Sequence, residues 1–254
     1  MDKQEDPTEW VAVPDKLAAE PFYATYKRRC LELLEPRHGG HYLDVGAGAG
    51  DDAFAIASSA NCTVIGIDRS LTMAKVCHGR SQIPASVCEA AELPFRDETF
   101  DGTRADRTFQ HLLDPRRALG EIIRVSRSGA RIVTVDPDYD TQVMEFSDQV
   151  LAPRILRYRA DHQLRNGTIS HQTPGMFHDA GLASVGVESL TLSVRDPAAV
   201  DSVMGLRTWP RMAARHQYIA PDEADRWEQL FDETVRDEKF FYAVTFFITV
   251  GVKP

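Results

Sequence analysis

The sequence contains little cysteine, and its four cysteines are scattered. Cys30, Cys62, Cys77 and Cys88 form no C-x-x-C pair and have no histidine cluster to accompany them. This spacing argues against a zinc site and against the disulfide framework of a small secreted domain. We therefore expect reduced, mostly buried thiols in a cytoplasmic protein.

Long hydrophobic runs and an excess of positive charge are also missing. The longest apolar candidate, Phe240 to Val252, is shorter than the roughly 18 residues of a membrane helix and is interrupted by threonines. The acidic residues 1–6 are followed by no apolar stretch, so they do not resemble a secretory signal. With 29 basic and 38 acidic residues, the net charge of −9 repels nucleic-acid phosphates. We expect binding to neither nucleic acid nor membrane.

Strand and helix patterns alternate through the first half of the chain. Asp114 followed by Pro115 is a helix-start signal, and Ser70 is a second candidate helix cap. Because crossover connections between parallel strands are right-handed, this alternation predicts an α/β fold with a doubly wound, mostly parallel sheet. Strands are expected at 41–45, 63–67, 85–88, 100–105 and 131–135, with helices at 51–60, at 70–76 and from 115 onward.

The last third of the chain has a different pattern. Two stretches of alternating apolar residues, Ser184 to Val194 and Tyr242 to Val252, predict an antiparallel pair at one edge of the sheet, with a break in the first near Glu188. Met144 to Arg165 and Pro197 to Lys239 are predicted to be helical. We expect one domain over 1–254, divided into an N-terminal helical cap (1–36), a cofactor-binding half (37–136), helical lid segments around an acceptor pocket (137–181 and 196–239) and the strand pair (182–195 and 240–254).

A glycine-rich loop follows the first predicted strand. Gly46, Gly48 and Gly50 alternate there and allow a ligand to approach the backbone closely, although a tight turn alone would also use them. Asp68 ends the next strand, 22 residues after Gly46, where it can accept hydrogen bonds from ribose hydroxyls or cap the following helix. A dinucleotide fingerprint requires glycine at the position of Asp51, so this fingerprint fails.

Several acidic residues surround the glycine loop. Asp44, Asp51 and Asp52 would repel a pyrophosphate, whereas a ligand with sulfonium and ammonium groups would be favoured. S-adenosylmethionine has both groups. The dipole of the following helix also favours Asp51 and Asp52, independently of any ligand.

Four motifs in order carry a family resemblance. They are Leu43–Gly50 (LDVGAGAG), Gly66–Ser70 (GIDRS) with Met73, Glu89–Phe95 (EAAELPF) followed by Phe100-Asp101, and Arg124–Gly129 (RVSRSG). Through them the chain, over roughly Tyr42 to Asp138, resembles the class I S-adenosylmethionine-dependent methyltransferases of the small-molecule type, which includes quinone and natural-product methyltransferases. The resemblance implies an α/β fold with a seven-stranded, mostly parallel sheet whose last strand is antiparallel, and S-adenosylmethionine as the cofactor.

The resemblance also implies a set of cofactor contacts. The glycine loop would lie along the methionine part, Asp68 would bind ribose, and Met73 would contact adenine or pack in the core. Glu89 stands where the family usually has aspartate, and Ser128–Ala130 replaces Pro-Gly-Gly. The predicted contacts are Asp44, Gly46, Ala47, Gly48, Gly50, Asp68, Arg69, Met73, Glu89 and Ala90, with Arg107 or Arg28 (or its neighbour Arg29) at the methionine carboxylate.

Histidine is the natural base for a hydroxyl acceptor near neutral pH. His111 follows the fourth strand and is the leading candidate, either as a base or as a residue that orients the loop or the cofactor. His162 and Tyr139 are weaker candidates. Asp136 and Asp138 are plausible acceptor contacts at the mouth of the fifth strand.

The remaining histidine and aromatic candidates could equally have purely structural roles. His171 and His178 lie in or beside a turn and have no assigned role. The aromatic residues Trp209, Tyr218 and Trp227 could line an apolar acceptor pocket or pack helices against the core. We predict no metal site, because no cluster of acids or histidines with ligand spacing stands out.

The sequence predicts a metal-independent methyltransferase that acts on oxygen, nitrogen or carbon of a small, partly apolar molecule. Two alternatives stay open. One is an S-adenosylmethionine-binding protein that catalyses another reaction, such as a cyclisation, or only binds. The other is a nucleotide-dependent oxidoreductase on the same fold. The expected partner is a small-molecule acceptor, and a homodimer is left open beside a monomer.

Overall fold

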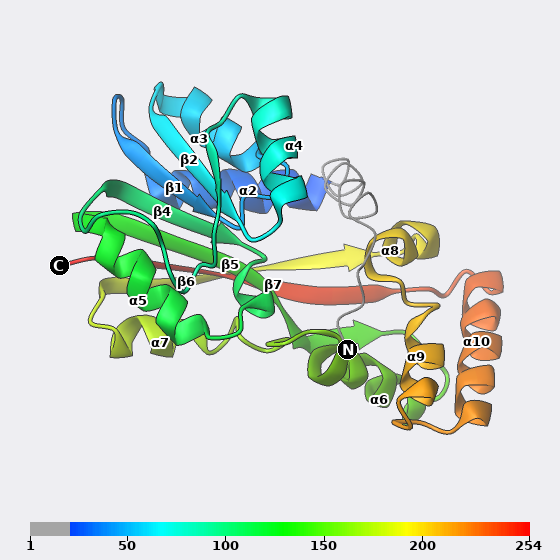
Figure 1. Ribbon diagram of the computed structural model, residues 1–254. Helices are drawn as coiled ribbons and strands as arrows, with labels where there is room; N and C mark the ends of the chain where they lie inside the picture. The colour runs from blue at the N-terminus through cyan, green and yellow to red at the C-terminus, as the bar shows by residue number, and fades with distance from the viewer. Residues whose placement is uncertain (1–20) are drawn as a thin grey trace.

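The computed structural model describes residues 21–254 (Figure 1), so the first part of the predicted cap over 1–36 lies outside the described residues. The strands are β1 (His41–Val45), β2 (Thr63–Asp68), β3 (Ala85–Val87), β4 (Phe100–Asp106), β5 (Ser126–Met144), β6 (Ala183–Val194) and β7 (Tyr242–Val252). The helices are α2 (Pro21–Leu34), α3 (Asp51–Ala60), α4 (Leu71–Ser81), α5 (Pro115–Val125), α6 (Leu151–Tyr158), α7 (Thr173–Asp179), α8 (Pro197–Met204), α9 (Trp209–Arg215) and α10 (Pro221–Arg236). The structure also contains a 3₁₀ turn, η1 (Phe109–His111), and a π-helical turn, η2 (Arg159–Gln163).

The seven strands form one sheet in the order β3-β2-β1-β4-β5-β7-β6. The pairs from β3 to β5 are parallel, and β7 runs antiparallel to both β5 and β6. The strand order reverses between β1 and β4, so their carboxyl ends diverge and leave room for a ligand there. The predicted doubly wound, mostly parallel sheet with an antiparallel last strand is confirmed.

Local sequence signals begin two of the helices as predicted. The side chain of Ser70 accepts a hydrogen bond from the backbone N–H of Met73 and caps α4. Asp114 accepts from the N–H of Arg117, and Pro115 takes the first turn of α5, where its missing N–H removes no helical hydrogen bond. These caps fix where α4 begins after β2 and where α5 begins after η1.

Two buried apolar clusters lie on opposite faces of the sheet. Successive residues of β5 point to opposite faces, and Val133 joins the cluster that includes α2 and α3, whereas Ile132 joins the one that includes α5 and α7. Figure 1 shows the same division, with α5 and α7 below the sheet and α2 and α3 above it. Both faces of the parallel part are therefore covered, as such sheets require.

The fifth strand is much longer than the sequence predicted. The expectation of helix over residues 137–181 is wrong for its first part, because β5 continues to Met144. Asp136 to Asp138 pair with β7, and after a bulge Val143 and Met144 pair with β7 again, so a partner strand satisfies the backbone of this extension. Helix begins only with α6, at Leu151 rather than at Met144.

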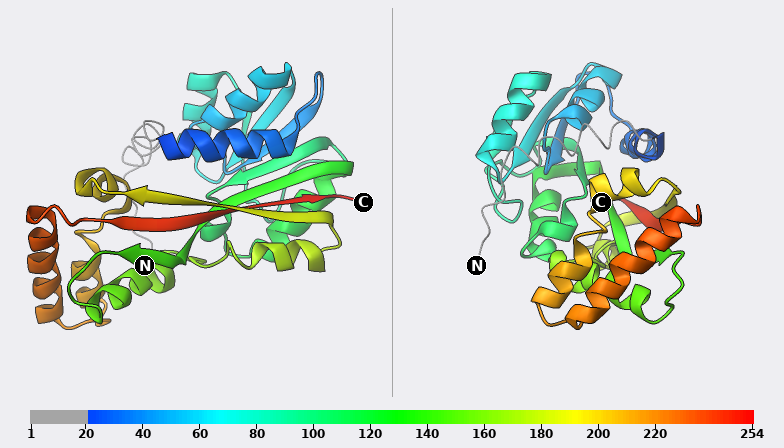
Figure 2. Two further views of the ribbon diagram at one scale, coloured as in Figure 1. Left: turned by 180° about the vertical axis from the view of Figure 1, so that it is seen from behind. Right: turned by 90° about the vertical axis from the view of Figure 1, so that its right-hand side faces the viewer.

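The long ends of β5 and β7 carry a helical lobe. Figures 1 and 2 show α6, α9 and α10 gathered at one end of the molecule, beyond the parallel part of the sheet. Trp227 of α10 stacks on Phe146 at a centroid distance of 4.4 Å, and both side chains are fully buried. Residues 196–239 form α8, α9 and α10, and the role of this segment as a lid stays a prediction.

The sixth strand is continuous, so the predicted break near Glu188 is wrong. Glu188 and Ser189 both pair with β7, and the irregularity lies earlier, between Ala183 and Gly186. Arg29 of α2 forms a two-pronged ion pair with Glu188, at 2.7 Å from Nε and 2.6 Å from Nη2. This ion pair ties the N-terminal helix to the edge strand.

The cysteines behave as expected for reduced thiols. All four are free, and Cys30 and Cys77 are buried. Burial raises the pKa of Cys30 to about 12 and that of Cys77 to about 11, so both stay protonated at neutral pH. These two side chains act as small apolar residues of the core.

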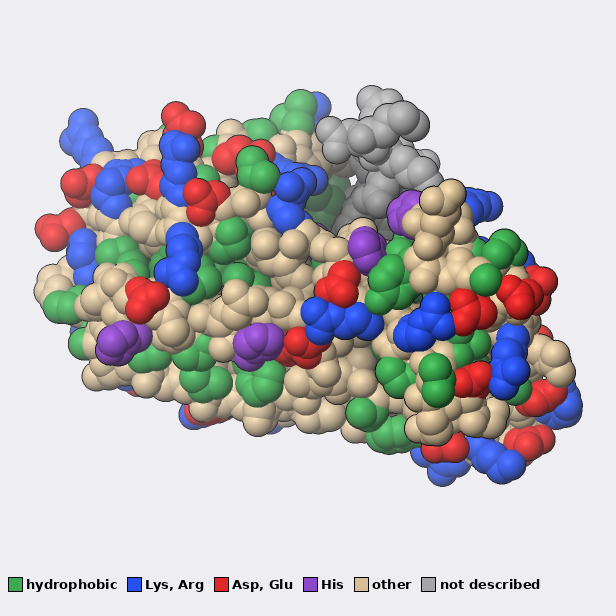
Figure 3. All heavy atoms as spheres, turned by 90° about the horizontal axis from the view of Figure 1, so that it is seen from below, with side chains coloured by type: hydrophobic (Ala, Val, Ile, Leu, Met, Phe, Trp, Pro, Cys, Tyr) green, Lys and Arg blue, Asp and Glu red, His purple; other side chains and the backbone are tan. Residues whose placement is uncertain are grey.

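The outer surface of the helical lobe mixes charges of both signs. Arg211 pairs with Asp225 and Glu228, and Arg207 pairs with Asp232. Figure 3 shows acidic and basic side chains side by side over this part of the face seen from below. Within residues 21–254 no helix has the length and apolar character that a membrane crossing requires.

Candidate active site

The glycine loop turns back on itself at the carboxyl end of β1. Gly46 has a φ of +75°, and a Cβ added there would lie 2.2 Å from the hydroxyl oxygen of Thr108. That hydroxyl donates to the carbonyl of Val45 at 3.0 Å. The position therefore requires glycine both for its backbone conformation and for the close approach of the segment after β4.

Asp68 connects this loop to the start of α4. One of its carboxylate oxygens accepts from the backbone N–H of Gly48 at 3.2 Å, and the other accepts from Ser70 at 2.8 Å. The side chain is partly exposed at the end of β2 and keeps free lone pairs for the hydroxyls of a ribose. Gly48, with a φ of +53°, faces the methyl end of Met73 across this space.

The remaining predicted cofactor residues lie around the same edge of the sheet. Ala90 is buried and Glu89 and Arg69 are exposed. Arg28 projects from α2 with 71% of its side chain exposed, and its nearest acidic partner is Glu32 of the same helix, at 3.9 Å. The structure brings the loop, Asp68 and Met73 together, while each individual cofactor contact stays a prediction.

A buried arginine lies beneath the glycine loop. Arg104 of β4 is 3% exposed and forms ion pairs with three carboxylates, Asp44 at 3.6 Å, Asp52 at 3.1 Å and Asp106 at 2.7 Å. Asp52 also pairs with Lys27 at 2.7 Å. This cluster could not be predicted from the sequence, because two of the partners of Arg104 come from β1 and α3, which are distant in the chain.

These ion pairs change the predicted electrostatics of the loop. We expected Asp44 and Asp52 to present negative charge to a cationic ligand, but Arg104 and Lys27 neutralise them. Burial raises the pKa of Asp44 to about 7 against the opposing effect of Arg104. The pKa of Asp52 is raised by burial but lowered further by Arg104 and Lys27, to about 2. Two of the three acids on which the prediction of a cation-binding loop rests are therefore ion-paired, whereas Asp51 stays about half exposed.

Asp44 nevertheless keeps one free acceptor. Its Oδ2 atom is buried and has no hydrogen-bond partner among the described residues. A buried acceptor without a donor is costly, and an ammonium group or an ordered water at the loop would satisfy it. The site thus fits the cofactor through this atom, the glycine loop and Asp68 rather than through net negative charge.

Arg107 closes the same cluster on the side of the N-terminal helix. Its backbone has a φ of +49°, which turns the chain sharply after β4. Its Nε atom lies 3.4 Å from Asp106, and its guanidinium lies 5.6 Å from the ring of Tyr23. The hydroxyl of Tyr26 donates to Asp106 at 3.1 Å. The side chain of Arg107 is 27% exposed, so it can still meet a carboxylate of the cofactor.

His111 lies in η1, immediately beyond the carboxyl end of β4. Loss of hydration and then the positive charges of Arg159, Arg69 and Arg107 lower the pKa of His111 to about 4, although the residue as a whole is exposed. The imidazole is therefore neutral at pH 7 and has a nitrogen lone pair that can accept a proton.

Side chains from three segments fix the position of η1. Asp136 accepts from the N–H of Gln110, and Ser170 donates to the carbonyl of Asp136 at 2.6 Å. Asn166 donates its side-chain amide to the carbonyls of Phe109 and Leu112. Asp136, predicted as an acceptor contact, is 2% exposed and acts here as a support for η1.

Arg159 is a site residue that the sequence analysis missed. It begins the π-helical turn η2, a rare geometry that is frequent at functional sites. Its guanidinium lies 5.3 Å from the ring of Tyr139 and 5.4 Å from that of Trp209, which are 5% and 1% exposed. Its sequence context, a polar position in a predicted helix, carried no signal of this placement.

The other predicted aromatic and histidine positions separate into two groups. Tyr139, Trp209 and Trp227 all belong to one buried cluster, and within it Tyr139 and Trp209 also contact the guanidinium of Arg159. His162 stacks on Tyr158 at 5.4 Å and meets the edge of Tyr218 at 5.0 Å. These contacts explain His162 as a packing residue within the helical lobe.

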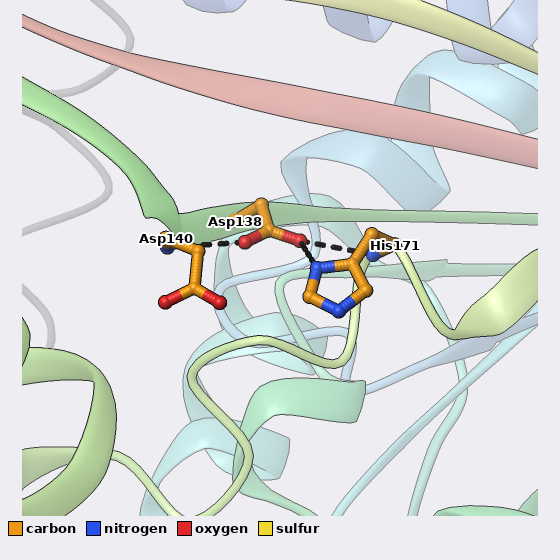
Figure 4. A group of neighbouring side chains, drawn as sticks. All are labelled: Asp138, Asp140 and His171. Carbon is orange, nitrogen blue, oxygen red and sulfur yellow. Dashed lines mark hydrogen bonds and ion pairs between the residues drawn. The ribbon is translucent and has the colours of Figure 1, made fainter.

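A second group of polar residues lies under the carboxyl end of β5. Asp138 is fully buried and accepts from Nδ1 of His171 at 2.5 Å, from the backbone N–H of His171 at 3.0 Å and from that of Asp140 at 3.1 Å. Figure 4 shows Asp138 between the other two residues. We had assigned no role to His171, yet alternate aspartates at 136, 138 and 140 were a visible signal.

These three side chains are the group within residues 21–254 that could hold a metal ion, with ligand atoms within 4.8 Å of one another. Both carboxylates of the group already have partners. Asp138 is bonded directly to His171, and Asp140 is ion-paired with Arg157. A metal ion would have to displace both interactions, so we assign the group no metal.

Comparisons with known proteins agree with this geometry. A family model described as a methyltransferase domain matches residues 43–134. An uncharacterised 37.1 kDa protein in transposon TN4556 of Streptomyces fradiae is 34% identical over 247 residues, which cover 95% of this chain and 70% of that protein. The O-methyltransferase cnsE of Penicillium expansum is 33% identical over 185 residues, covering 68% of this chain and 63% of cnsE, less than two thirds of its length.

A solved structure shows the same fold. The YcgJ protein from Bacillus subtilis superposes with a TM-score of 0.63 at 21% sequence identity, and the match covers 91% of this chain and 98% of that one. The chain belongs to the class I S-adenosylmethionine-dependent methyltransferases. Its cofactor is S-adenosylmethionine, as predicted, and its enzyme class is that of the methyltransferases.

Proposed function

We propose that this enzyme transfers the methyl group of S-adenosylmethionine to an oxygen atom of a small, partly aromatic molecule without the help of a metal ion. The observation that carries the proposal is the position of His111 in η1, just beyond the carboxyl end of β4, where loss of hydration and the charges of Arg159, Arg69 and Arg107 lower the pKa of its imidazole to about 4. The similarity to the O-methyltransferase cnsE supports oxygen as the acceptor atom.

The proposed reaction is an in-line displacement. The sulfonium group of the cofactor supplies the methyl group. His111 accepts the proton of the acceptor hydroxyl as the oxygen–carbon bond forms and the carbon–sulfur bond breaks, which releases S-adenosylhomocysteine. Tyr139 and Trp209 pack against Arg159 and would help to exclude water from this side of the site.

The electrostatic cluster beneath the loop supports this mechanism. Arg104, Lys27 and Arg107 balance Asp44, Asp52 and Asp106, so the site presents little net charge to the cofactor. Rigid ion pairs also hold β1, β4 and α3 in register around the glycine loop. Preorganised groups of this kind cost no rearrangement during the reaction.

The experiment uses S-adenosylmethionine with a deuterated methyl group. Purified enzyme is incubated with it and a panel of phenols and hydroxylated aromatic acids, and products are analysed by mass spectrometry and NMR. The proposal predicts a product that carries the labelled methyl group on oxygen. Label on nitrogen or carbon contradicts the choice of oxygen. Conversion of an acceptor with no label incorporated supports the alternative of a cofactor-binding protein with a different reaction, such as a cyclisation.

A further inference from the structure

Arg159 carries a positive charge that no carboxylate neutralises. Within the part of the chain that the structure describes, the only hydrogen bond of its side chain runs from Nη1 to the side-chain oxygen of Gln163, at 2.9 Å. Its Nε atom is buried and has no partner. The other two arginines near the site differ, because Arg104 has three carboxylate partners and Arg107 has one.

The surroundings of Arg159 keep it in the site. Two almost fully buried rings, Tyr139 and Trp209, lie against its guanidinium. Contact with aromatic faces holds a planar guanidinium in place and fixes the direction of its N–H donors. The charge of Arg159 also acts on His111, whose pKa is lowered first by burial and then by this charge. Burial raises the pKa of Tyr242 against the opposing effect of Arg159.

The partly buried guanidinium of Arg159 has no carboxylate partner among the described residues. A buried or half-buried charge costs free energy unless a partner compensates it. Aromatic contact compensates part of this cost, but it leaves the Nε donor unsatisfied. An anionic group on the bound acceptor would supply both the missing acceptor atom and the missing charge.

We propose that the acceptor carries a carboxylate group and that Arg159 binds this group while the methylated oxygen faces His111. This inference rests on the function proposed above and specifies its substrate class as a hydroxylated aromatic acid. Arg159 would act as a specificity-determining residue, because a guanidinium recognises a carboxylate through two parallel hydrogen bonds. A neutral ester or amide of the same molecule would lose this pairing.

The test measures binding to the enzyme saturated with S-adenosylhomocysteine. The probes are 2-naphthoate and 2-naphthamide, which have the same ring system but differ in charge. We expect the acid to bind roughly tenfold more tightly than the amide or better, as a charge-assisted pair predicts. We expect R159Q to reduce this ratio to near one. We expect R159K, which keeps the charge but loses the planar fork, to show an intermediate ratio.

Matched controls separate this role from others. Arg117 of α5 is exposed and, among the described residues, also has no carboxylate partner, so R117Q should leave the ratio unchanged. Should R159Q fail to fold, R159K decides the question, because a preference for acid equal to that of the wild type overturns the inference. Equal affinity of acid and amide for the wild type, including no measurable binding of either, also overturns it.

Two further outcomes show which proposal has failed. If R159Q weakens S-adenosylhomocysteine binding about tenfold or more while the acid preference persists, Arg159 serves the cofactor and the inference is wrong. If the wild-type enzyme does not bind S-adenosylhomocysteine, both the proposed function and the inference fail. Normal cofactor binding without acid preference overturns the inference alone.

Discussion

Arg104 and Asp44 face each other across neighbouring strands beneath the glycine loop, with Nη1 and Oδ1 3.6 Å apart and neither side chain more than 3% exposed. Arg104 ↔ Asp44 is also a register pair of β4 and β1. This ion pair therefore belongs to the framework of the sheet. It links β1 and β4 directly beneath the glycine loop, and the two side chains neutralise each other's charge.

Removing Arg104 should destabilise the fold. R104M leaves Asp44, Asp52 and Asp106 without their shared partner, and breaking a buried pair in this way costs about 3–5 kcal/mol. The free energy of unfolding in urea measures the effect, with R117Q as the exposed control. A loss below about 1 kcal/mol would show that the cluster contributes little to stability.

The raised pKa of Asp44 predicts a specific dependence of stability on pH. Because its folded pKa of about 7 lies above its ordinary value of 3.8, the folded state binds a proton that the unfolded state does not bind between these values. The contribution of Asp44 to stability is therefore fully present below about pH 4 and is lost as the pH rises through 7. For one such group the slope approaches about 1.4 kcal/mol per pH unit.

Comparison of the wild type with D44N isolates this contribution. Urea unfolding between about pH 4 and pH 8 should show that the difference in stability between the two proteins changes with pH in this window. D97N, at a residue that is 74% exposed, serves as the control. A constant difference between wild type and D44N would contradict the raised pKa.

His111 should determine the rate of methyl transfer rather than the affinity for cofactor. We expect H111Q to lower kcat by about 100-fold or more, the usual loss when a general base is removed. Because the pKa of His111 is about 4, its imidazole stays deprotonated at neutral pH, and the acid limb of kcat/KM should lie near that value rather than near 6.5.

The pH profile of kcat/KM, measured with H178Q as a control at a histidine that is 87% exposed, checks this prediction. R159Q removes one of the positive charges near His111, so its acid limb should move to higher pH. An unchanged kcat in H111Q would leave His111 with an orienting role only.

The proposal of metal-independent transfer predicts that a chelator has no effect. Dialysis against EDTA should leave kcat unchanged, and H171A should reduce stability by about 1–3 kcal/mol because Asp138 loses a hydrogen bond in a buried position. Activity that EDTA removes and Mg²⁺ or Zn²⁺ restores, and that D140N also loses, would instead identify Asp138, Asp140 and His171 as a metal site.

Local signals made much of the fold predictable. The cap at Ser70 and the Asp114-Pro115 pair each act within a few residues, so they are visible in the sequence, and the order of four motifs identified the family. The extension of β5 to Met144 was not predictable in the same way. It depends on pairing with β7, about a hundred residues later in the chain, which overrides the local pattern.

The candidate site was predictable only where its residues lie in the glycine loop and directly after strands. Asp68, Met73 and His111 follow strand ends, and parallel strands bring such positions to one edge. The partners of Arg104 and the placement of Arg159 depend on contacts between distant segments. Asp44 and Asp52 therefore looked unpaired in the sequence, but they are ion-paired with Arg104 and Lys27 in the folded protein.

The most direct test of the account is calorimetric titration with S-adenosylhomocysteine of the wild type, D68A and S70A. D68A removes the proposed ribose contact together with the bonds to Gly48 and Ser70, whereas S70A removes only the helix cap. We predict saturable binding at one site, weakened about 10- to 100-fold in D68A and little changed in S70A. Absence of binding to the folded wild type, or equal affinity of D68A and wild type, would contradict the assignment of the cofactor site.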